Sequence, residues 1–123
     1  SSPTAGGVTV GAGVSPKKID KIIGVMKAYT TRVGEGPFVT ELDNELGELL
    51  RQTGGEFGAT TGRPRRCGWL DLVALKYAVR LNGITGLAVN HVDTIGKLDN
   101  IKLCVAYNCN GKETTDFSTM SIP

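Results

Sequence analysis

The sequence predicts an α/β fold with about three helices and two to four strands. Apolar residues recur at helical spacing in several segments, and they alternate with polar residues along residues 101–107. Glycine makes up 17 of the 123 residues, a content that fits loops which approach a ligand closely. In α/β proteins such loops follow the carboxyl ends of the strands. We therefore expect helices and strands in one fold, with ligand sites in the loops between them.

The composition excludes several classes of protein. The chain has 14 basic and 12 acidic residues, so its net charge is +2 and it has no global field that would attract nucleic acid or a membrane surface. Its length suffices for one domain with a core. No apolar run approaches the roughly 20 residues that span a bilayer. Cys67, Cys104 and Cys109 lack the spacing of a zinc site, so we expect no metal site here and reduced thiols in a cytoplasmic protein.

The first predicted helix follows a glycine-rich loop. Residues 1–14 combine glycines with small side chains, which indicates a loop with at most a brief strand. Ser15 and Pro16 then provide an N-cap and a proline at the first helical position. Apolar residues at helical spacing predict a helix from there to about Tyr29. The apolar stripe consists of Ile19, Ile22, Ile23 and Met26. The lysines expected on the solvated face are Lys17, Lys18, Lys21 and Lys27.

A second helix is predicted after the irregular turn Gly34–Pro37, where two glycines and a proline exclude regular structure. Thr40, with Asp43 three residues later, resembles a capping box, and Gly54-Gly55 provides a stop signal. Leucines at helical spacing supply the face that we expect to be buried. They are Leu42, Leu46, Leu49 and Leu50.

The second half of the chain is predicted to contain a third helix and two strands. The helix is expected from about Trp69 to the stop signal Asn82-Gly83. Residues 87–89 form a short apolar run, which predicts a buried strand. The alternation along residues 101–107 predicts a strand with one face toward the core.

A hairpin and three packing aromatic residues complete the expected fold. Asn110-Gly111 is a favourable turn, so residues 112–118 are expected to pair back as a weaker strand. The aromatic residues expected to pack rather than bind ligands are Tyr29, Tyr77 and Trp69, the last on a helix face.

The densest cluster of basic residues lies in the segment Gly58–Trp69. Arg63, Arg65 and Arg66 fall within four positions around Pro64. Guanidinium groups bind carboxylate and phosphate in a bidentate fork, and glycine lets a backbone come close to a ligand. This composition fits a loop that holds a small molecule with several anionic groups. The alternative is a solvated basic loop, or a patch that contacts nucleic acid or an acidic partner.

A second candidate site is Asn90-His91-Val92-Asp93, at the expected end of a strand. It is similar to the Asn-Lys-x-Asp element of guanine-nucleotide proteins, with His91 in the lysine position. An ionised carboxylate can accept two hydrogen bonds, and guanine, unlike adenine, offers N1–H and a 2-amino group side by side. Asp93 is therefore a candidate for selecting GTP over ATP. The alternative is a polar turn in which Asp93 caps the residues that follow and His91, the single histidine, is structural.

Several motifs together resemble the adenylosuccinate synthetase family. Residues 59–69 follow the family pattern Ala-Thr-Thr-Gly-Arg-x-Arg-Arg-x-Gly-Trp, and the segments Ser1–Gly7, Thr31–Leu42 and Asn90–Asp93 also resemble the family. The resemblance extends in order from Ser1 to about Tyr107. It implies that residues 1–123 are a single internal fragment of a larger P-loop-like α/β enzyme, without the N-terminal phosphate-binding and catalytic segment.

The resemblance also implies an activity for the parent enzyme. It would act in purine nucleotide biosynthesis and ligate IMP and L-aspartate to adenylosuccinate, with release of GDP and phosphate from GTP. The family uses Mg²⁺, forms a 6-phosphoryl-IMP intermediate and is homodimeric. Its acid–base aspartate and histidine are not among these residues, so the resemblance implies no catalytic residue and no metal ligand here, and a fragment that is inactive alone.

The resemblance assigns binding roles to individual residues. The loop that closes on L-aspartate would consist of Ala59, Thr60, Thr61, Gly62, Arg63, Pro64 and Arg65. Arg63 and Val33 would contact IMP, and Arg65 would face the GTP phosphates. The guanine base would lie against His91, Val92 and Asp93, although the family commonly has lysine at the His91 position.

Two other interpretations stay open from the sequence. The chain could be a non-catalytic module that binds an anion or nucleic acid through Arg63, Arg65 and Arg66, although an aromatic content of 6% does not favour a nucleic-acid platform. It could also be too incomplete to bind any ligand. Binding that falls steeply with salt would indicate nucleic acid, whereas discrimination between GTP and ATP would indicate a nucleotide site.

Overall fold

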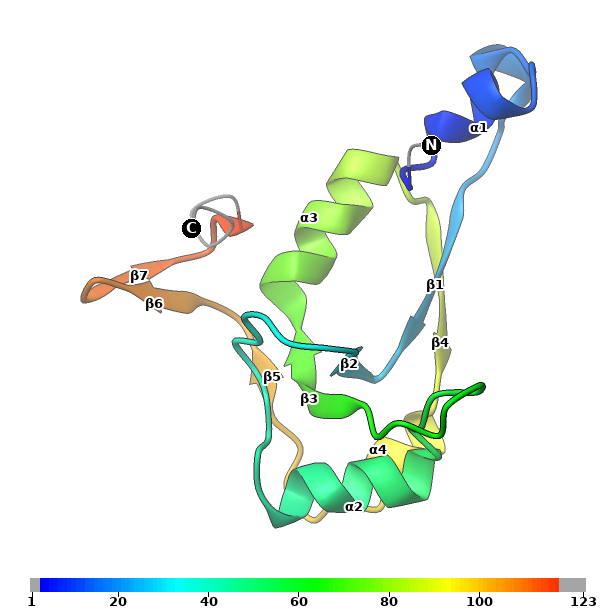
Figure 1. Cartoon of the computed structure of the whole chain (residues 1–123). Helices are drawn as coiled ribbons and strands as arrows, with labels where there is room; N and C mark the ends of the chain where they lie inside the picture. Colours follow the sequence, from blue (N-terminus) through cyan, green and yellow to red (C-terminus); the bar gives the residue numbers. More distant parts are fainter. Residues whose placement is uncertain (1–2, 118–123) are drawn as a thin grey trace.

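Helices and strands alternate along the chain in the computed structural model, which describes residues 3–117 (Figure 1). The strands form a parallel pair of β1 (Ile23–Lys27) with β4 (Gly86–Asn90) and a mixed three-stranded sheet in the order β2 (Tyr29–Arg32), β3 (Arg66–Asp71), β5 (Leu103–Cys104). A two-stranded hairpin consists of β6 (Tyr107–Cys109) and β7 (Lys112–Thr114). This arrangement confirms the predicted α/β class. Within residues 3–117, no helix has the length and apolar character needed to cross a membrane.

The predicted first helix is wrong. A five-residue helix α1 (Gly7–Gly11) lies in the expected N-terminal loop, and only a 3₁₀ turn, η1 (Pro16–Lys18), follows Ser15. The segment then forms strand β1 (Ile23–Lys27).

Partner strands explain why this segment is extended. β1 pairs in parallel with β4 (Gly86–Asn90), so its backbone hydrogen bonds are made across the sheet. Gly24 also allows a close approach, because a Cβ there would lie 2.9 Å from Ile84 Cδ1. β-branched residues suit the pleated surface, although Ile23 and Val25 remain 67% and 74% exposed. Residues 23–27 therefore form a strand despite the helical spacing of their apolar residues, because β4, which is distant in the sequence, pairs with them.

The second helix, α2 (Glu45–Gly54), starts later than predicted. Asn44 is its N-cap, and the Asn44 side chain accepts hydrogen bonds from Leu46 N and Gly47 N at 3.1 and 3.2 Å. Gly55 ends the helix in the left-handed region at φ 63°, as the stop signal predicts. Leu50 is fully buried, whereas the other leucines on the predicted face are exposed or half-buried.

The third helix, α3 (Leu72–Asn82), is preceded by a strand that the sequence did not predict. Strand β3 (Arg66–Asp71) pairs antiparallel with β2 (Tyr29–Arg32) and parallel with β5 (Leu103–Cys104). Asp71 then caps α3 by accepting from Val73 N and Ala74 N. The helix ends at Gly83, as predicted.

The carboxyl-terminal third is more open than predicted. The strand at residues 87–89 is present as part of β4, but its side chains are exposed rather than buried. Residues 101–107 do not form one strand: β5 ends at Cys104, and a new strand, β6 (Tyr107–Cys109), begins after a gap. Of the predicted core face, only Tyr107 is buried; Ile101, Leu103 and Val105 are exposed.

The predicted hairpin is present, because β6 pairs antiparallel with β7 (Lys112–Thr114), but its second strand is shorter than predicted: residues 115–117 form no strand. The end of the predicted pairing segment, at residue 118, lies outside the described residues.

The core lies where α2, β2, β3 and the short helix α4 (Val92–Ile95) meet. Its buried residues are Tyr29, Leu50, Cys67, Ile95 and Leu98, and Ala28, Leu42 and Trp69 pack against them. Both predicted binding segments adjoin this cluster: residues 58–65 lie between α2 and β3, and residues 90–93 span the end of β4 and the first turn of α4.

The packing aromatic residues are placed in part as predicted. Tyr29 is buried, and the centroids of the Tyr77 and Phe117 rings lie 5.0 Å apart. Trp69 packs against the core, but from strand β3 rather than from a helix face.

Candidate functional site

The segment between α2 and β3, residues 58–65, is called the arginine loop here (Figure 1). Its stem is closed by a bridge between Phe57 and Pro64 and by a hydrogen bond of 2.7 Å from Gly58 N to Arg63 O. Gly62 N donates to Gly58 O at 2.9 Å, and Gly62 has φ 68°, a value that glycine adopts without strain. The loop is therefore a closed turn on a hydrogen-bonded stem.

The tip of the arginine loop is open to solvent. Residues 59–64 are all exposed. Thr61 Oγ1 accepts a long hydrogen bond of 3.4 Å from Arg63 N. Among residues 3–117, the Arg63 guanidinium has no hydrogen-bond or ion-pair partner. Arg63 thus has a free cationic side chain in the same exposed tip as Thr60 and Thr61.

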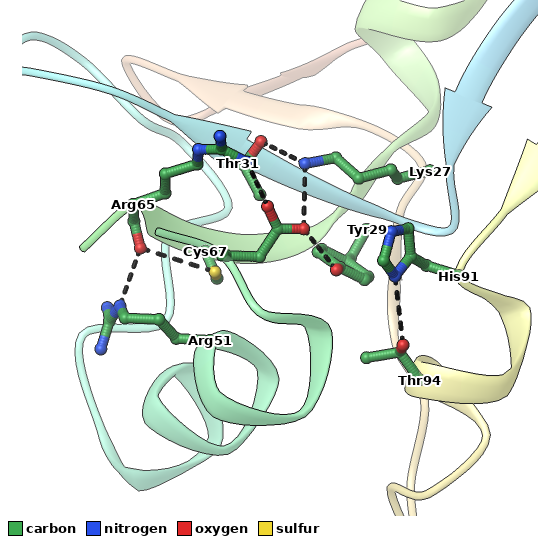
Figure 2. A network of polar contacts seen from close by, with 9 residues as sticks. Lys27, Tyr29, Thr31, Arg51, Arg65, Cys67, His91 and Thr94 are labelled. Carbon is green, nitrogen blue, oxygen red and sulfur yellow. Dashed lines mark hydrogen bonds and ion pairs between the residues drawn. The ribbon is translucent and has the colours of Figure 1, made fainter. Parts of the chain in front are cut away.

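Arg65, at the base of the loop, is held at three points. Its backbone N–H donates to Glu56 O at 2.9 Å, and its guanidinium Nη1 forms an ion pair with Glu56 Oε1 at 2.8 Å. Its carbonyl accepts a hydrogen bond of 2.8 Å from Arg51 Nε and a weaker one from the Cys67 thiol (Figure 2). Arg65 is therefore anchored, in contrast to Arg63.

Glu56 is a buried carboxylate, only 2% exposed, with three donors. In addition to Arg65 on Oε1, its Oε2 accepts from Tyr29 Oη at 2.5 Å and from Lys27 Nζ at 3.1 Å. Lys27 Nζ also donates to Thr31 Oγ1 at 2.6 Å (Figure 2). We call Lys27, Tyr29, Glu56 and Arg65 the Glu56 network. A buried charge is stable only when it is paired and hydrogen-bonded, and here both carboxylate oxygens are.

The network shifts the acidity of its members. Burial by itself would raise the pKa of Glu56, but the hydrogen bonds from Tyr29, Arg65 and Lys27 outweigh it, so this pKa lies below its ordinary value. Burial, followed by the hydrogen bond to Glu56, raises the pKa of Tyr29 well above its ordinary value. Glu56 is therefore ionised and Tyr29 is a neutral donor near pH 7.

The second predicted site adjoins the same network. His91 has φ 62°, which is uncommon for a residue other than glycine, and it immediately precedes α4. Its imidazole faces the Tyr29 ring edge-on, with centroids 5.6 Å apart, and its Nδ1 lies 3.2 Å from Thr94 Oγ1 (Figure 2). The imidazole is thus half-buried against Tyr29.

The remaining residues of that site are open. Val92 and Asp93 are exposed in the first turn of α4. The Asp93 carboxylate has no hydrogen-bond or ion-pair partner in the part of the chain that the structure describes. Asp93 is therefore the acceptor that this loop leaves free.

Arg66 is a structural residue. Its Nε and Nη2 bind the two oxygens of Glu41 at 2.9 and 2.7 Å, and its Nη1 donates to the carbonyls of Gly34 and Gly36. Its guanidinium lies 5.4 Å from the centre of the Phe38 ring. With every guanidinium nitrogen of Arg66 engaged and Arg65 paired with Glu56, the three arginines do not form a shared free anion patch.

Val33 is exposed and directly follows β2, at the start of the turn whose carbonyls Arg66 holds. The segment Gly58–Trp69 therefore contacts the turn that begins at Val33 through Arg66, and not through the tip of the arginine loop.

Residues 1–122 match the family model described as adenylosuccinate synthetase. The chain belongs to the adenylosuccinate synthetase family. It is 66% identical over 117 residues to the adenylosuccinate synthetase of Acetivibrio thermocellus, and 60% identical over 117 residues to those of Caldanaerobacter subterraneus and Thermodesulfovibrio yellowstonii. Each match covers 95% of this chain. The chain spans 27% or 28% of the length of these relatives.

The family resemblance did not point to Glu56 or Lys27, which the fold places beside the predicted loops. Lys27 was assigned to the solvated face of a helix, and that assignment fails because Lys27 lies on β1 and pairs with Glu56. Glu56 adjoins the arginine loop in sequence, which is the one signal that could have indicated it.

Metal ligation and thiol pairing are not features of the described residues. Over residues 3–117, no three His, Cys, Asp or Glu side chains gather as metal ligands would. Cys67, Cys104 and Cys109 are unpaired thiols. A mainly apolar cavity of 620 Å³ lies between β2 and α3. None of the residues that the family resemblance assigns to substrate or nucleotide binding lines this cavity.

Proposed function

We propose that this chain is part of an enzyme that ligates IMP and L-aspartate to adenylosuccinate, with hydrolysis of GTP to GDP and phosphate. The observation that carries the proposal is 66% identity to an adenylosuccinate synthetase over 95% of the chain. The exposed loops at residues 59–64 and 92–93 support it, because each leaves one charged side chain unpaired within residues 3–117. The enzyme would act in AMP biosynthesis, in the cytoplasm, as a homodimer.

The arginine loop is proposed to bind L-aspartate. A free guanidinium such as that of Arg63 can hold a carboxylate in a bidentate fork, and the hydroxyls of Thr60 and Thr61 can donate to the same groups. The complete proposed set is Ala59, Thr60, Thr61, Gly62, Arg63, Pro64 and Arg65. Val33 and Arg63 are proposed to contact IMP. Such contacts orient the aspartate amine for displacement of the phosphate from 6-phosphoryl-IMP.

GTP is proposed to bind against Arg65, His91, Val92 and Asp93. The free Asp93 carboxylate can accept from guanine N1–H and the 2-amino group, which adenine cannot match. Arg65 would face the phosphates, where a fixed cation stabilises the charge that develops during phosphoryl transfer. His91 is held by Tyr29 and Thr94, so we propose that it shapes the base pocket.

The remaining catalytic parts are proposed to lie outside this chain. They are the phosphate-binding glycine-rich loop, the acid–base residues and the ligands of Mg²⁺. Mg²⁺ would neutralise phosphate charge in the intact enzyme. The present residues would bind and orient substrates, and would not transfer the proton.

The test is adenylosuccinate formation by the intact enzyme that contains this chain. IMP, L-aspartate, Mg²⁺ and either GTP or ATP are supplied, and each component is omitted in turn. We expect product only with all three substrates and with GTP preferred over ATP. Absence of product with either nucleotide would overturn the proposal.

A further inference from the structure

The arginine loop and the guanine-site candidate are connected through one buried carboxylate. Glu56 binds Arg65 through Oε1 and Tyr29 through Oε2, and the Tyr29 ring contacts the His91 imidazole. In Figure 2 the labelled residues Arg65, Tyr29 and His91 lie along this path, with the Tyr29 ring beside the His91 imidazole. The arginine loop lies between α2 and β3, whereas His91 lies between β4 and α4. Glu56 and Tyr29 therefore link two segments that are far apart in the sequence.

Arg65 is anchored in a way that leaves donors available. Only Nη1 of its guanidinium is engaged, by Glu56 Oε1, and among residues 3–117 its Nε and Nη2 have no partner. Its side chain is 32% exposed. In Arg66, by contrast, Nε, Nη1 and Nη2 are all used by Glu41 and backbone carbonyls. Arg65 is built as a fixed cation with one free side, and Arg66 is not.

The charges in the network fit an anion at that free side. Lys27 and Arg65 carry two positive charges, and Glu56 carries one negative charge, so the network holds a net charge of +1. Tyr29 and Lys27 both donate to Oε2, which leaves Oε1 to orient the guanidinium. A carboxylate with two acceptor oxygens satisfies all three donors at once, whereas an amide at this position would turn one NH₂ group toward a donor.

We propose that Glu56 is a positioning residue for nucleotide binding: it fixes Arg65 toward the phosphates and, through Tyr29, steadies His91 beside the base. The inference rests on the proposed function, because it names how the same site orders its nucleotide. It predicts that Glu56 acts through Arg65 and on GTP, and that IMP binding is largely independent of it.

The first test compares the intact wild-type enzyme with Glu56→Gln. We expect the KM for GTP to rise roughly ten- to hundredfold, as for loss of a charged hydrogen bond, while the KM for IMP changes less than about twofold. Glu45→Gln is the matched control, because Glu45 is an exposed carboxylate in the first turn of α2. Its KM values should remain at the wild-type level. An unchanged KM for GTP in Glu56→Gln, or an equal loss for GTP and IMP, overturns the inference.

A double-mutant cycle with Arg65→Gln tests whether Glu56 acts through Arg65. If it does, adding Glu56→Gln to Arg65→Gln changes the KM for GTP far less than Glu56→Gln does alone. Fully additive effects overturn the inference.

A variant that does not fold can be distinguished from an incorrect proposed function by a second variant and a direct binding measurement. If Glu56→Gln does not fold, Tyr29→Phe takes its place, because it keeps the ring against His91 and removes only the hydroxyl donor. This variant should raise the KM for GTP and leave the KM for IMP unchanged. A raised KM for IMP with an unchanged KM for GTP overturns the inference. If the wild type forms no adenylosuccinate, the proposed function is overturned, and equilibrium GTP binding decides the role of Glu56: equal affinity in wild type and Glu56→Gln refutes it.

Discussion

Arg65 and Glu56, nine residues apart, are joined by two bonds, one between backbones and one between side chains. The Arg65 N–H donates to the Glu56 carbonyl at 2.9 Å, and the Arg65 guanidinium contacts Glu56 Oε1 at 2.8 Å. These bonds close the base of the arginine loop, while residues 59–64 stay exposed at its tip. The base of the loop is therefore held by the fold, and its tip is open to solvent.

Substitution of Arg63 should weaken substrate binding without loss of stability, whereas substitution of Arg66 should lower stability. Arg63→Leu should leave the free energy of unfolding within about 0.5 kcal/mol of wild type, because the side chain is exposed and unpaired within residues 3–117. In the intact enzyme it should raise the KM for L-aspartate by tenfold or more, on the order of one lost charged hydrogen bond.

Arg66→Leu should lower the melting temperature, since it removes the contacts with Glu41, Gly34 and Gly36. Thermal unfolding and steady-state kinetics of both variants check the pair. A marked loss of stability in Arg63→Leu would contradict the assignment of Arg63 to ligand binding.

Asp93 should decide the choice of nucleotide. In Asp93→Asn, the preference of kcat/KM for GTP over ATP should fall by roughly tenfold or more, because an amide offers one acceptor where the carboxylate offers two. The melting temperature should not change, since Asp93 is exposed. Asp99→Asn, a nearby exposed aspartate, is the control and should keep the wild-type preference. A GTP preference that survives in Asp93→Asn would show that other groups read the base.

Gly54 should be intolerant of a side chain. A Cβ at this position would collide with the Tyr29 hydroxyl, which donates to Glu56. We expect Gly54→Ala to destabilise the fold by about 1–3 kcal/mol, the usual cost of overpacking. In Gly86→Ala the new Cβ meets no atom within 4 Å, so its effect should be smaller. Chemical denaturation of both variants provides the comparison, and equal stability of the two would argue against close packing at Tyr29.

Glu56 should make stability depend on pH on the acid side. Its pKa is lower in the folded state than its ordinary value of 4.5, so its stabilising contribution is present above about pH 4.5. That contribution is lost as the pH falls through the folded-state pKa. Denaturation of wild type and Glu56→Gln between pH 7 and pH 3 should show a difference in stability that shrinks as the pH falls. A difference that grows toward low pH would contradict this sign.

Local signals in the sequence were sufficient where the backbone satisfies itself within a short segment. The stops of α2 and α3 at Gly55 and Gly83, and the turn at Asn110-Gly111, were predicted because left-handed glycines and a tight turn are local properties. Local signals failed where the partner is remote. β1 pairs with a strand about sixty residues later, and β3 lies between β2 and β5, so neither could be identified from its own spacing.

For this protein, the sequence by itself determined the family, the α/β class and the two exposed loops, because these depend on residue order and on glycine and proline chemistry. Only the tertiary structure decided which charges are free. Arg63, Arg65 and Arg66 look equivalent in the sequence, yet the fold leaves Arg63 open, pairs Arg65 with Glu56 and consumes Arg66 in contacts with Glu41. The reason is physical: a buried carboxylate must find donors, and which cations it takes depends on the strands that meet around it.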